Sequence, residues 1–464
     1  MAAEQTDWWV PAIRRSGKPL YVEIADAIAE DRLSGRLTAL QRLPPQRWLA
    51  KRLGVNFSTV FRAYIEAQRR GLITAHIGQG SFVSPARAGH DPAADRPSGD
   101  LSMNLPPEPD DPALVERLAL SFARLGQSHD PRALLRYGDF IGAAADRAAA
   151  ARWLAPRLPK LAPQDILLAA GAQAALLAVL SSLATGGEAV CCDQLCYPGL
   201  KSLAAQLGLR LIGLPADDDG PDPASLAFAC RDFAPKALCL TPTLHNPTTR
   251  TISERRRRQL LEVAQSHGLP IIEDDAYGAL PDAAPPPLAA LAPGAVFHIA
   301  GLAKSLSGGL RLAYVTAPDS RWLSRITTAA RATTLMASPL AAALASDWIE
   351  SGLAQDLLGA VRAESRARQG IAAACLPPGL SEADPQGFHL WLRLPPPWTR
   401  TDFLASLRSQ GIGVMAADAF TVPGEPPPEA ARLSLGGPIG RDHLAQVLRS
   451  IAATLHQPPA PAGI

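Results

Sequence analysis

The apolar positions near the start of the chain follow the period of an α-helix. Over residues 20–33 they recur every three or four positions, until a Ser-Gly pair interrupts the pattern. Because side chains at this spacing return to one face of a helix, we predict an amphipathic helix here. A second, shorter helix follows the two prolines at 44–45, turns Leu49 and Leu53 inward and ends at Gly54.

A third helix and a hairpin complete the pattern of this region. Either Asn56 or Ser58 is suited to cap a longer helix that continues to Arg70. Two helices joined by a turn that contains a glycine form a helix-turn-helix. Residues 71–83, GLITAHIGQGSFV, then alternate apolar and polar positions around two glycines, as the strands of a hairpin do. The front of the chain therefore predicts a helix-turn-helix followed by a two-stranded wing.

Beyond about residue 100, short apolar runs alternate with longer helical stretches. The runs are ILLAAG, AVCCDQ, LRLIGLP, ALCLTPT, LPIIEDD, VFHIAG and LAYVTAP. Strands that alternate with helices favour the α/β class, in which a sheet is covered by helices on both faces. We therefore predict that the larger part of the chain is an α/β domain.

A polar stretch separates the two patterns. Residues 84–99, SPARAGHDPAADRPSG, are rich in proline and alanine and have no periodicity, which is typical of a linker. We predict a first domain at 12–83, a linker at 84–100 and a second domain at 101–455. The proline-rich tail at 456–464 is expected to be disordered.

Composition narrows the class of protein without identifying it. Of 464 residues, 47% are hydrophobic, which is ample for a buried core, and the formal net charge of +2 conceals a cluster of arginines near the front. Six cysteines lie at no spacing typical of a zinc site or a disulfide framework, so we expect no metal. The start of the chain lacks a secretory signal, and polar residues interrupt the apolar stretch 166–184. We expect a soluble, cytoplasmic protein that does not enter a membrane.

Polar side chains follow the ends of several predicted strands. Asn246 follows ALCLTPT, Asp274 ends LPIIED, Lys304 follows VFHIA, and Gly171 follows ILLAA. Asp274 lies 28 residues after Asn246, and Lys304 lies 30 residues after Asp274, so each interval has room for one helix and one strand. Since cofactors of such sheets bind at the carboxyl ends of the strands, we expect these residues to meet at one rim.

The residue types match the chemical needs of pyridoxal 5'-phosphate. Its aldehyde requires an amine, which Lys304 supplies, and its ring nitrogen requires a carboxylate, for which Asp274 is the candidate. Asn246 and Tyr277 are candidate donors to the phenolic oxygen. The phosphate requires a cation and backbone N–H groups, for which the candidates are Arg311 and the start of a helix at Gly171, Ala172 and Gln173.

From about residue 100 to 455 the sequence resembles the fold-type I, pyridoxal-phosphate-dependent aminotransferases. The resemblance lies in TPTLHNPTT, in IIEDDAYGAL and in HIAGLAKSLSGGLRLAYV. The Asp-x-x-Tyr pattern of these enzymes selects Asp274 with Tyr277 from the three neighbouring carboxylates. It implies that Lys304 joins the cofactor as an aldimine, and that a smaller α+β domain lies at the C-terminal end of the α/β domain.

Three further residues are assigned by the resemblance. Tyr197, in CYPGL, matches the aromatic residue that stacks on the cofactor ring, and Arg432, in ARLSLGG, matches the arginine that binds a substrate α-carboxylate. Tyr137, in LLRYGDFIG, matches a segment that reaches the cofactor of the neighbouring subunit in family dimers. The sequence departs from the family at Gly301 and Ala303, where relatives usually carry serines, and this implies weaker cofactor binding.

Residues 19–83 resemble the winged helix-turn-helix of the GntR family of DNA-binding regulators. The resemblance lies in PLYVEIADAI, LSGRL, RLPPQRWLAKRLGV, TVFRAY and GLITAHIGQGSFV. It implies that Arg47, Thr59 and Arg62 contact DNA and that Gly78 and Gly80 shape the wing tip. Arg42 and Lys51 belong to the cluster of basic side chains in this unit, which is expected to hold phosphates. Family members commonly have Ser-Arg-Asn where this chain has Asn56, Phe57 and Ser58, and a wing arginine where it has His76.

The fusion of these two parts resembles the MocR subgroup of GntR regulators, whose effector domain is aminotransferase-like. The resemblance implies a homodimer that binds a double-stranded DNA operator and senses pyridoxal phosphate or an amino compound. A working aminotransferase with a DNA-binding appendage remains an alternative, as does a degenerate domain that no longer binds the cofactor. The effector, the operator sequence and the direction of regulation are not encoded in any motif.

Overall fold

We analysed a computed structural model of the chain, which describes residues 8–13, 18–38, 41–70, 72–76, 80–84, 99–128 and 130–458. The chain divides into two compact units, residues 1–96 and 97–464. The expected wing-tip residue Gly78, most of the expected linker and the last six residues of the expected tail lie outside the described residues.

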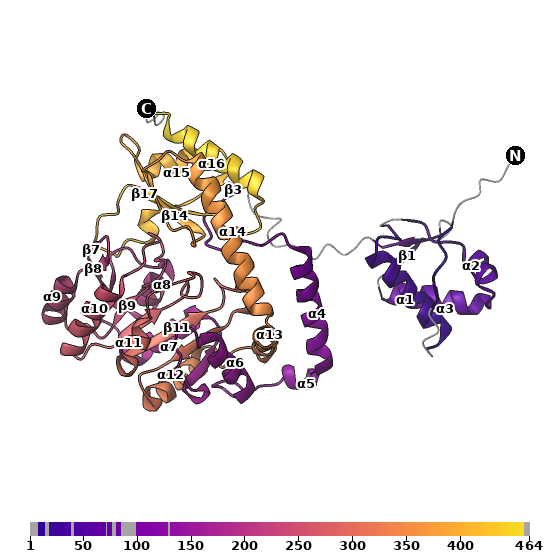
Figure 1. The fold of residues 1–464 in the computed structure, drawn as a ribbon, viewed down its shortest axis with the longest axis horizontal. Coiled ribbons are helices and arrows are strands. Elements are labelled where there is room, and N and C mark those ends of the chain that lie inside the picture. Colours follow the sequence, from indigo (N-terminus) through magenta and orange to yellow (C-terminus); the bar gives the residue numbers. More distant parts are fainter. Residues whose placement is uncertain are drawn as a thin grey trace. The chain divides into compact units, whose positions relative to one another are not determined.

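The first unit contains the three helices and the hairpin that the sequence predicts (Figure 1). Helices α1 (Leu20–Leu33), α2 (Gln46–Leu53) and α3 (Phe57–Arg69) precede the antiparallel strands β1 (Ile73–His76) and β2 (Gly80–Val83). Gly54 ends α2 with a φ of +68°, a conformation that glycine adopts without strain. The helix α3 is capped by Asn56, whose Oδ1 accepts the Ser58 N–H at 3.0 Å.

The core of the first unit lies between α1 and the inner faces of α2 and α3. Ile24 and Ile28 of α1 pack in one cluster with Leu49 of α2 and with Val60 and Tyr64 of α3. The Tyr64 hydroxyl donates a 2.8 Å hydrogen bond to the carbonyl of Pro44, which ties α3 to the start of α2. This packing fixes which face of α3 remains outside.

The second unit is built on a seven-stranded sheet, and each of its strands lies in one of the seven apolar runs. The strand order is β4-β12-β11-β10-β9-β5-β6, and among the described strands of this sheet only β12 runs antiparallel to its neighbours. In chain order the strands are β4 (Ile166–Ala169), β5 (Ala189–Asp193), β6 (Arg210–Leu214), β9 (Leu238–Leu240), β10 (Ile271–Asp274), β11 (Val296–Gly301) and β12 (Ala313–Thr316).

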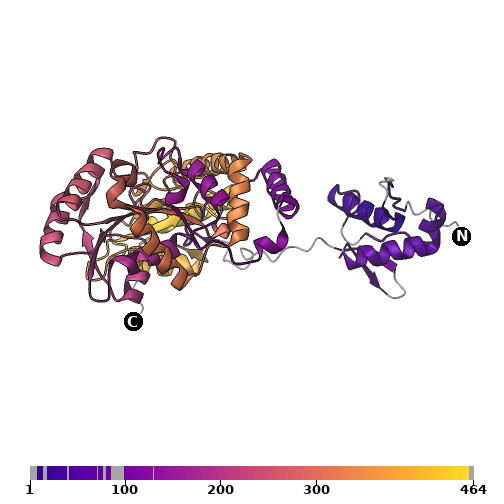
Figure 2. The same ribbon diagram turned by 90° about the horizontal axis from the view of Figure 1, so that it is seen from below.

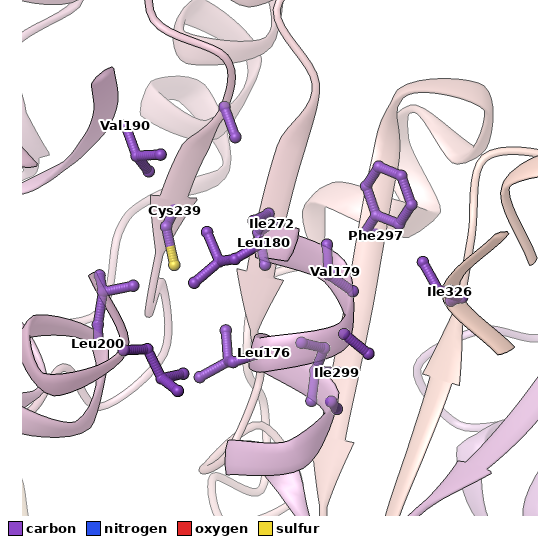
Figure 3. Packing of buried hydrophobic residues seen from close by; sticks show 14 of the residues in the cluster. Leu176, Val179, Leu180, Val190, Leu200, Cys239, Ile272, Phe297, Ile299 and Ile326 are labelled. Carbon is purple, nitrogen blue, oxygen red and sulfur yellow. The ribbon is translucent and has the colours of Figure 1, made fainter. Parts of the chain in front are cut away.

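Helices cover both faces of this sheet, as the sequence predicts for the α/β class. One face packs against α7 (Ala172–Leu183), α8 (Pro198–Leu207) and α12 (Ser320–Thr333), and Figure 3 shows Leu176, Val179 and Leu180 of α7 in this cluster. The opposite face packs against a second layer of helices: α6 (Ala144–Leu154), α9 (Pro223–Phe233), α10 (Glu254–Ser266), α11 (Leu288–Leu291) and α13 (Pro339–Glu350). Neighbouring residues of a strand alternate between the two layers, since Ala313 faces one and Tyr314 the other.

A smaller α+β domain follows the large one. Its antiparallel sheet has the order β13-β14-β17-β16, with β13 (Ser381–Ala383), β14 (His389–Arg393), β16 (Met415–Ala416) and β17 (Ala430–Ser434). The helices α14 (Leu353–Cys375), α15 (Arg400–Ser409) and α16 (Arg441–Leu455) pack against it. Strand β3 (Gly99–Asp100), which the sequence analysis included in the linker, pairs with β15 (Ile412–Gly413) and therefore belongs to the second unit.

The second unit also contains two short strands, a short helix and a long helix outside these two sheets. The strands β7 (Ala216–Asp217) and β8 (Gly220–Pro221) form a small hairpin, and α5 (Pro131–Leu134) precedes α6. Helix α4 (Pro112–Ser128) lies beside α13 and α14 in both views (Figures 1 and 2), held by the ion pairs Arg117–Asp356 at 2.6 Å and Arg124–Asp347 at 2.8 Å. Within the described ranges, no helix is long and apolar enough to span a membrane, and no group of side chains is arranged to hold a metal.

Candidate functional site

Lys304 lies in the turn that follows β11, the third strand of the seven-stranded sheet. The amine is surrounded by protein, and its Nζ donates a hydrogen bond to the backbone carbonyl of Asn104. Burial lowers the pKa of Lys304 to about 8, and the positive charges of Arg432 and Arg311 act in the same direction. The neighbouring carboxylate of Asp274 partly offsets this effect. The lysine is therefore partly neutral near pH 8, which is the form that attacks an aldehyde.

Asp274 ends β10, the strand next to β11, and its side chain enters the same space. The residue is only 7% exposed, and its Oδ1 has no hydrogen-bond partner among the described residues. Burial, followed by the like charge of Asp275, raises the pKa of Asp274 to about 7, while Lys304 and His298 lower it. A buried carboxylate oxygen without a partner is costly unless a ligand supplies a donor.

The carboxylates on either side of Asp274 are occupied by the protein itself. Glu273 accepts the backbone N–H groups of Leu288 at 2.8 Å and Ala289 at 2.9 Å. Asp275 accepts two hydrogen bonds from Arg157, at 2.8 and 3.1 Å, and lies 3.1 Å from His298 Nε2. The three adjacent acids therefore have distinct environments, and Asp274 is the one that remains available to a ligand.

Asn246 and Tyr277 are connected to the site through residues of distant segments. Arg432, on β17, donates from Nη1 to Asn246 Oδ1 at 3.1 Å and from Nη2 to the carbonyl of Ser102. The Nδ2 of Asn104 donates to the Tyr277 hydroxyl at 2.8 Å. Both Asn246 and Tyr277 are buried. The hydrogen bonds therefore form two groups, one that joins Asn246 to the substrate-binding candidate Arg432 and one that joins Tyr277 to Lys304 through Asn104.

The start of α7 and Arg311 form a second part of the site. Gly171 precedes α7 with a φ of +95°, and a Cβ added there would lie only 3.3 Å from Arg311 Nη2. The guanidinium therefore lies against the first turn of the helix, where backbone N–H groups of Ala172 and Gln173 are not bonded within the helix. A cation beside a helix N-terminus is a suitable environment for a phosphate group.

Tyr197 faces the same space from the loop before α8. It is 37% exposed, and its phenol is close enough to interact electrostatically with Asp274, Arg311 and Arg432. A Cβ at Gly199 would lie 2.2 Å from the Tyr197 ring, so glycine is needed at 199 to leave room for this ring. The Nε2 of Gln173 donates to the Gly199 carbonyl at 3.0 Å and links this loop to α7.

The chain has Gly301 and Ala303 where relatives usually carry serines, and a close contact explains the first of these departures. A Cβ at Gly301 would lie 3.2 Å from the Cβ of Ala172, which is tighter than ordinary van der Waals contact. A serine at 301 would therefore press against the first turn of α7. At Ala303 a Cβ is already present, and no described contact explains the missing hydroxyl.

Tyr137 lies apart from this cluster. Its side chain is 80% exposed on the segment between α5 and α6, so within one chain it is not part of the buried site. Two residues of the site had not been identified from the sequence: Asn104, which contacts both Lys304 and Tyr277, and Arg157, which neutralises Asp275. No spacing or motif marks either residue, because each is brought to the site by a segment far away in the chain.

The basic residues of the first unit lie on its surface. Arg42, Arg47, Lys51 and Arg62 are exposed, and Thr59 is half-buried. Arg47 lies 5.9 Å from the centre of the Phe57 ring, and Arg62 lies 4.4 Å from that of Tyr21. At the loop end of the hairpin, where Gly80 pairs with His76, a Cβ at Gly80 would lie 3.0 Å from Arg42 Nε, so the wing strand runs directly beside this arginine.

Two family models match the chain, and together they cover most of it. The model for aminotransferase class I and II matches residues 99–450, and the model for bacterial regulatory proteins of the gntR family matches residues 20–83.

Two known regulators are similar to nearly the whole chain, and one solved aminotransferase structure is similar to its larger unit. The chain is 32% identical over 444 residues to the uncharacterized HTH-type transcriptional regulator YdeF of Bacillus subtilis, with 95% of each chain covered. It is 30% identical to the vitamin B6 salvage pathway transcriptional repressor PtsJ of Salmonella typhimurium, covering 94% of this chain and 97% of that one. The solved structure of LysN, the α-aminoadipate aminotransferase of Thermus thermophilus complexed with N-(5'-phosphopyridoxyl)-L-leucine, is similar with a TM-score of 0.68 at 25% identity. That match covers 77% of this chain and 91% of LysN.

Proposed function

This chain belongs to the aminotransferase class I and II family and is a MocR-type transcriptional regulator with a gntR-family domain, and we propose that its aminotransferase-like unit binds pyridoxal phosphate through Lys304. The ligand state of this pocket would control how the N-terminal unit binds a double-stranded DNA operator. An effector shifts such an equilibrium only by binding the two states with different affinity. Since its target is DNA, we infer that it acts in the cytoplasm.

The observation that carries the proposal is the presence of Lys304 and Asp274 in one buried site, where each charge affects the pKa of the other group. An amine of lowered pKa and a buried carboxylate oxygen without a partner are the two groups that the opposite ends of one pyridine aldehyde require. The residues therefore fit the cofactor. When bound, pyridoxal phosphate supplies an aldehyde for amines and a ring that withdraws electrons.

The remaining residues of the site would hold the group in place. Arg311 and the first turn of α7 would bind its phosphate, and Tyr197 would cover one face of its ring. Asn246 and Tyr277 would donate to its phenolic oxygen. Asp274 would hold the proton of the ring nitrogen, and this contact would satisfy the Oδ1 that the protein leaves without a partner.

Arg432 supports an amino compound as the effector. The residue is 3% exposed, and its Nε is buried with no partner among the described residues. Burial lowers the pKa of Arg432 to about 10, so the guanidinium stays charged at neutral pH. A planar, charged group at this position would bind the α-carboxylate of an amino acid in a bidentate manner.

The same contacts support a second candidate function, a working aminotransferase. A lysine of lowered pKa is suited to move a proton as well as to bind the aldehyde, and Arg432 would hold the substrate. The two functions differ in turnover. A sensor would react with an amino acid once and change its DNA binding, whereas an enzyme would convert amino acid and keto acid repeatedly.

An exposed apolar surface supports a homodimer. Val115, Leu120 and Phe122 of α4 are 53–59% exposed, and Leu135 and Tyr137 are each 80% exposed on the segment that follows. Exposed apolar side chains that recur so often in one short stretch of the chain support a surface covered by another subunit. In such a dimer Tyr137 would reach the site of the neighbouring subunit.

Spectroscopy of the purified protein tests the cofactor. Added pyridoxal phosphate should give an absorbance band that borohydride fixes to the chain, and Lys304→Ala should lose both. A matched control is Lys201→Ala, whose amine instead contacts the carbonyl of Asp418 at 2.8 Å and should leave the band unchanged. If the unaltered chain gives no band, the degenerate-domain alternative is correct and this proposal is wrong.

Turnover and DNA binding then separate the two functions. Repeated conversion of an amino acid with a keto acid would identify the aminotransferase. A single-turnover spectral change, accompanied by a change in affinity for operator DNA, would identify the sensor. An amino acid that changes the spectrum in wild type should have a weaker effect in Arg432→Gln.

A further inference from the structure

The helix α3 exposes a line of large apolar side chains. Phe57 and Phe61 are each 44% exposed, and Ile65 is 50% exposed. They are four residues apart, so they lie along one stripe of the helix. We call these three residues the apolar stripe. The opposite side of α3 is packed into the core by Val60, Ala63, Tyr64 and Ala67, so α3 cannot turn the stripe inward.

The stripe is ordered by its own contacts. The Phe57 and Phe61 rings stack with centroids 6.0 Å apart and an interplanar angle of 28°. The guanidinium of Arg47, on α2, lies 5.9 Å from the centre of the Phe57 ring. The two rings and the arginine therefore form one surface that spans the turn between the two helices.

The charges around the stripe indicate the chemistry of its partner. Residues 46–69 contain five basic side chains and a single acidic one, Glu66. Glu66 is bound to Arg69 and Arg70, each at 2.7 Å, and these hydrogen bonds lower its pKa to about 2. Among the described residues, none of Arg47, Lys51 and Arg62 forms an ion pair. A second copy of this surface would bring like charges together, whereas a polyanion would be attracted.

A polyanion that also presents apolar groups would satisfy both features. The major groove of DNA is lined by phosphates, and the one apolar group that its base edges present is the C5-methyl of thymine. Phenylalanine is among the side chains that contact this methyl group. An α-helix fits into the major groove, so the side of α3 that carries the stripe would lie against the base edges.

We propose that the apolar stripe reads thymine methyl groups, so that the operator carries thymines where Phe61 and Ile65 face the groove. This inference rests on the proposed function, because it requires that α3 enters the major groove. It accounts for Phe57, which stands where related regulators commonly carry an arginine. Specificity at these base pairs would come from apolar contact, and the surrounding arginines and Lys51 would hold the phosphates.

The test uses the full-length protein and begins with an unbiased selection. The chain is incubated with a pool of random-sequence duplexes, and the retained sequences are determined. Thymines of the selected site are then replaced one at a time by deoxyuridine, which removes only the methyl group. At two or more positions we expect binding to weaken about fourfold, the equivalent of about 0.8 kcal/mol for one buried carbon.

Variants assign the effect to the stripe. Each of the variants Phe61→Ala and Ile65→Ala should lose the preference for thymine over deoxyuridine at one position of the selected site. At the other positions it should keep the wild-type preference. Because both side chains are largely exposed, the fold should persist, which circular dichroism checks. Phe228→Ala removes a phenylalanine that is 51% exposed on α9 of the second unit, and it should keep every preference.

Each outcome has a defined meaning. A selected site that binds equally well with deoxyuridine throughout would overturn the inference and leave the proposed function intact. A thymine preference that persists in both stripe variants would also overturn it. Loss of self-association in Phe61→Ala, with an unchanged thymine preference, would assign the stripe to a second copy of the chain. If no sequence is selected at all, the proposed DNA binding fails together with the inference.

Discussion

Asp274 and Asp275 are consecutive carboxylates whose pKa values the structure shifts in opposite directions. Burial raises the pKa of Asp274 to about 7. Burial acts on Asp275 in the same direction, but the charge of Arg157 and the contact with His298 outweigh it and hold the pKa of Asp275 at about 2. Because neighbouring side chains at the end of a strand point to opposite sides, one acid faces the ligand site and the other a permanent cation. This arrangement makes Asp274 responsive to a ligand.

Arg157→Ala should destabilise the protein strongly. The Arg157 side chain is 14% exposed and its partner Asp275 is 3% exposed, so the substitution leaves a buried carboxylate without its cation. Removing one member of such a pair costs about 3–5 kcal/mol, which urea denaturation would measure. The matched control is Arg152→Ala, which breaks the exposed pair with Glu350. That loss should be at most about 1 kcal/mol, and equal effects would contradict the burial argument.

The pKa of Asp274 predicts how stability depends on pH in the cofactor-free protein. The folded pKa is about 7, well above the ordinary value of 3.8, so the folded state binds a proton that the unfolded state has already released. The associated stability is fully present below pH 4 and is lost as pH rises from 4 to 7. Asp274→Asn cannot ionise, so above pH 7 it should be more stable than wild type by on the order of 4 kcal/mol.

The same variant should also fail to retain pyridoxal phosphate, because the amide cannot hold the charged ring nitrogen. Thermal unfolding of cofactor-free wild type and Asp274→Asn, from pH 4.5 to 8.5, checks the predicted difference in stability. The curves should converge at the acid end, and parallel curves would show that Asp274 does not titrate in this range.

The repetitive parts of this fold were predictable from the sequence because they depend on local patterns. Each of the seven apolar runs contains a strand of the central sheet, and Gly54 ends α2 as its position indicated. The order of the strands was not predictable in the same way. The strand β12, last of the seven in the chain, inserts between β4 and β11, and no local pattern encodes that pairing.

The candidate site was likewise predictable where it depends on local patterns and unpredictable where distant segments meet. Lys304, Asp274 and Asn246 follow predictable strand ends, so sequence reasoning placed them on one rim. Asn104 could not be found, because it reaches Lys304 and Tyr277 from a stretch without periodicity that lies 200 residues before the lysine. The exposed stripe on α3 was also missed, since Phe57 was noted only as a departure from the family and Phe61 and Ile65 were not singled out.

The salt dependence of DNA binding tests the role of Arg47. An exposed arginine at the start of α2 is placed to contact a phosphate, so its removal should weaken operator binding at all sequences. Arg47→Ala should also reduce the slope of log affinity against log salt by about 1. Arg258→Ala is a suitable control, because this exposed arginine lies on α10 of the second unit and pairs with Glu254. An unchanged slope in Arg47→Ala would exclude a phosphate contact.

Introducing the two family serines one at a time should distinguish the gain from a new hydrogen bond at 303 from the cost of a close contact at 301. Ala303→Ser adds a hydroxyl next to Lys304 without adding a Cβ, and one new hydrogen bond contributes about 0.5–1.5 kcal/mol. Its affinity for pyridoxal phosphate should therefore rise by roughly two- to tenfold. Gly301→Ser adds a Cβ 3.2 Å from that of Ala172, at the helix turn that would bind the phosphate, so no gain is expected. Equilibrium titration followed by absorbance measures both variants, and a second variant, Gly301→Ser with Ala172→Gly, should relieve the contact. If Gly301→Ser alone binds the cofactor as tightly as Ala303→Ser, the close approach of Gly301 to α7 does not explain the missing serine.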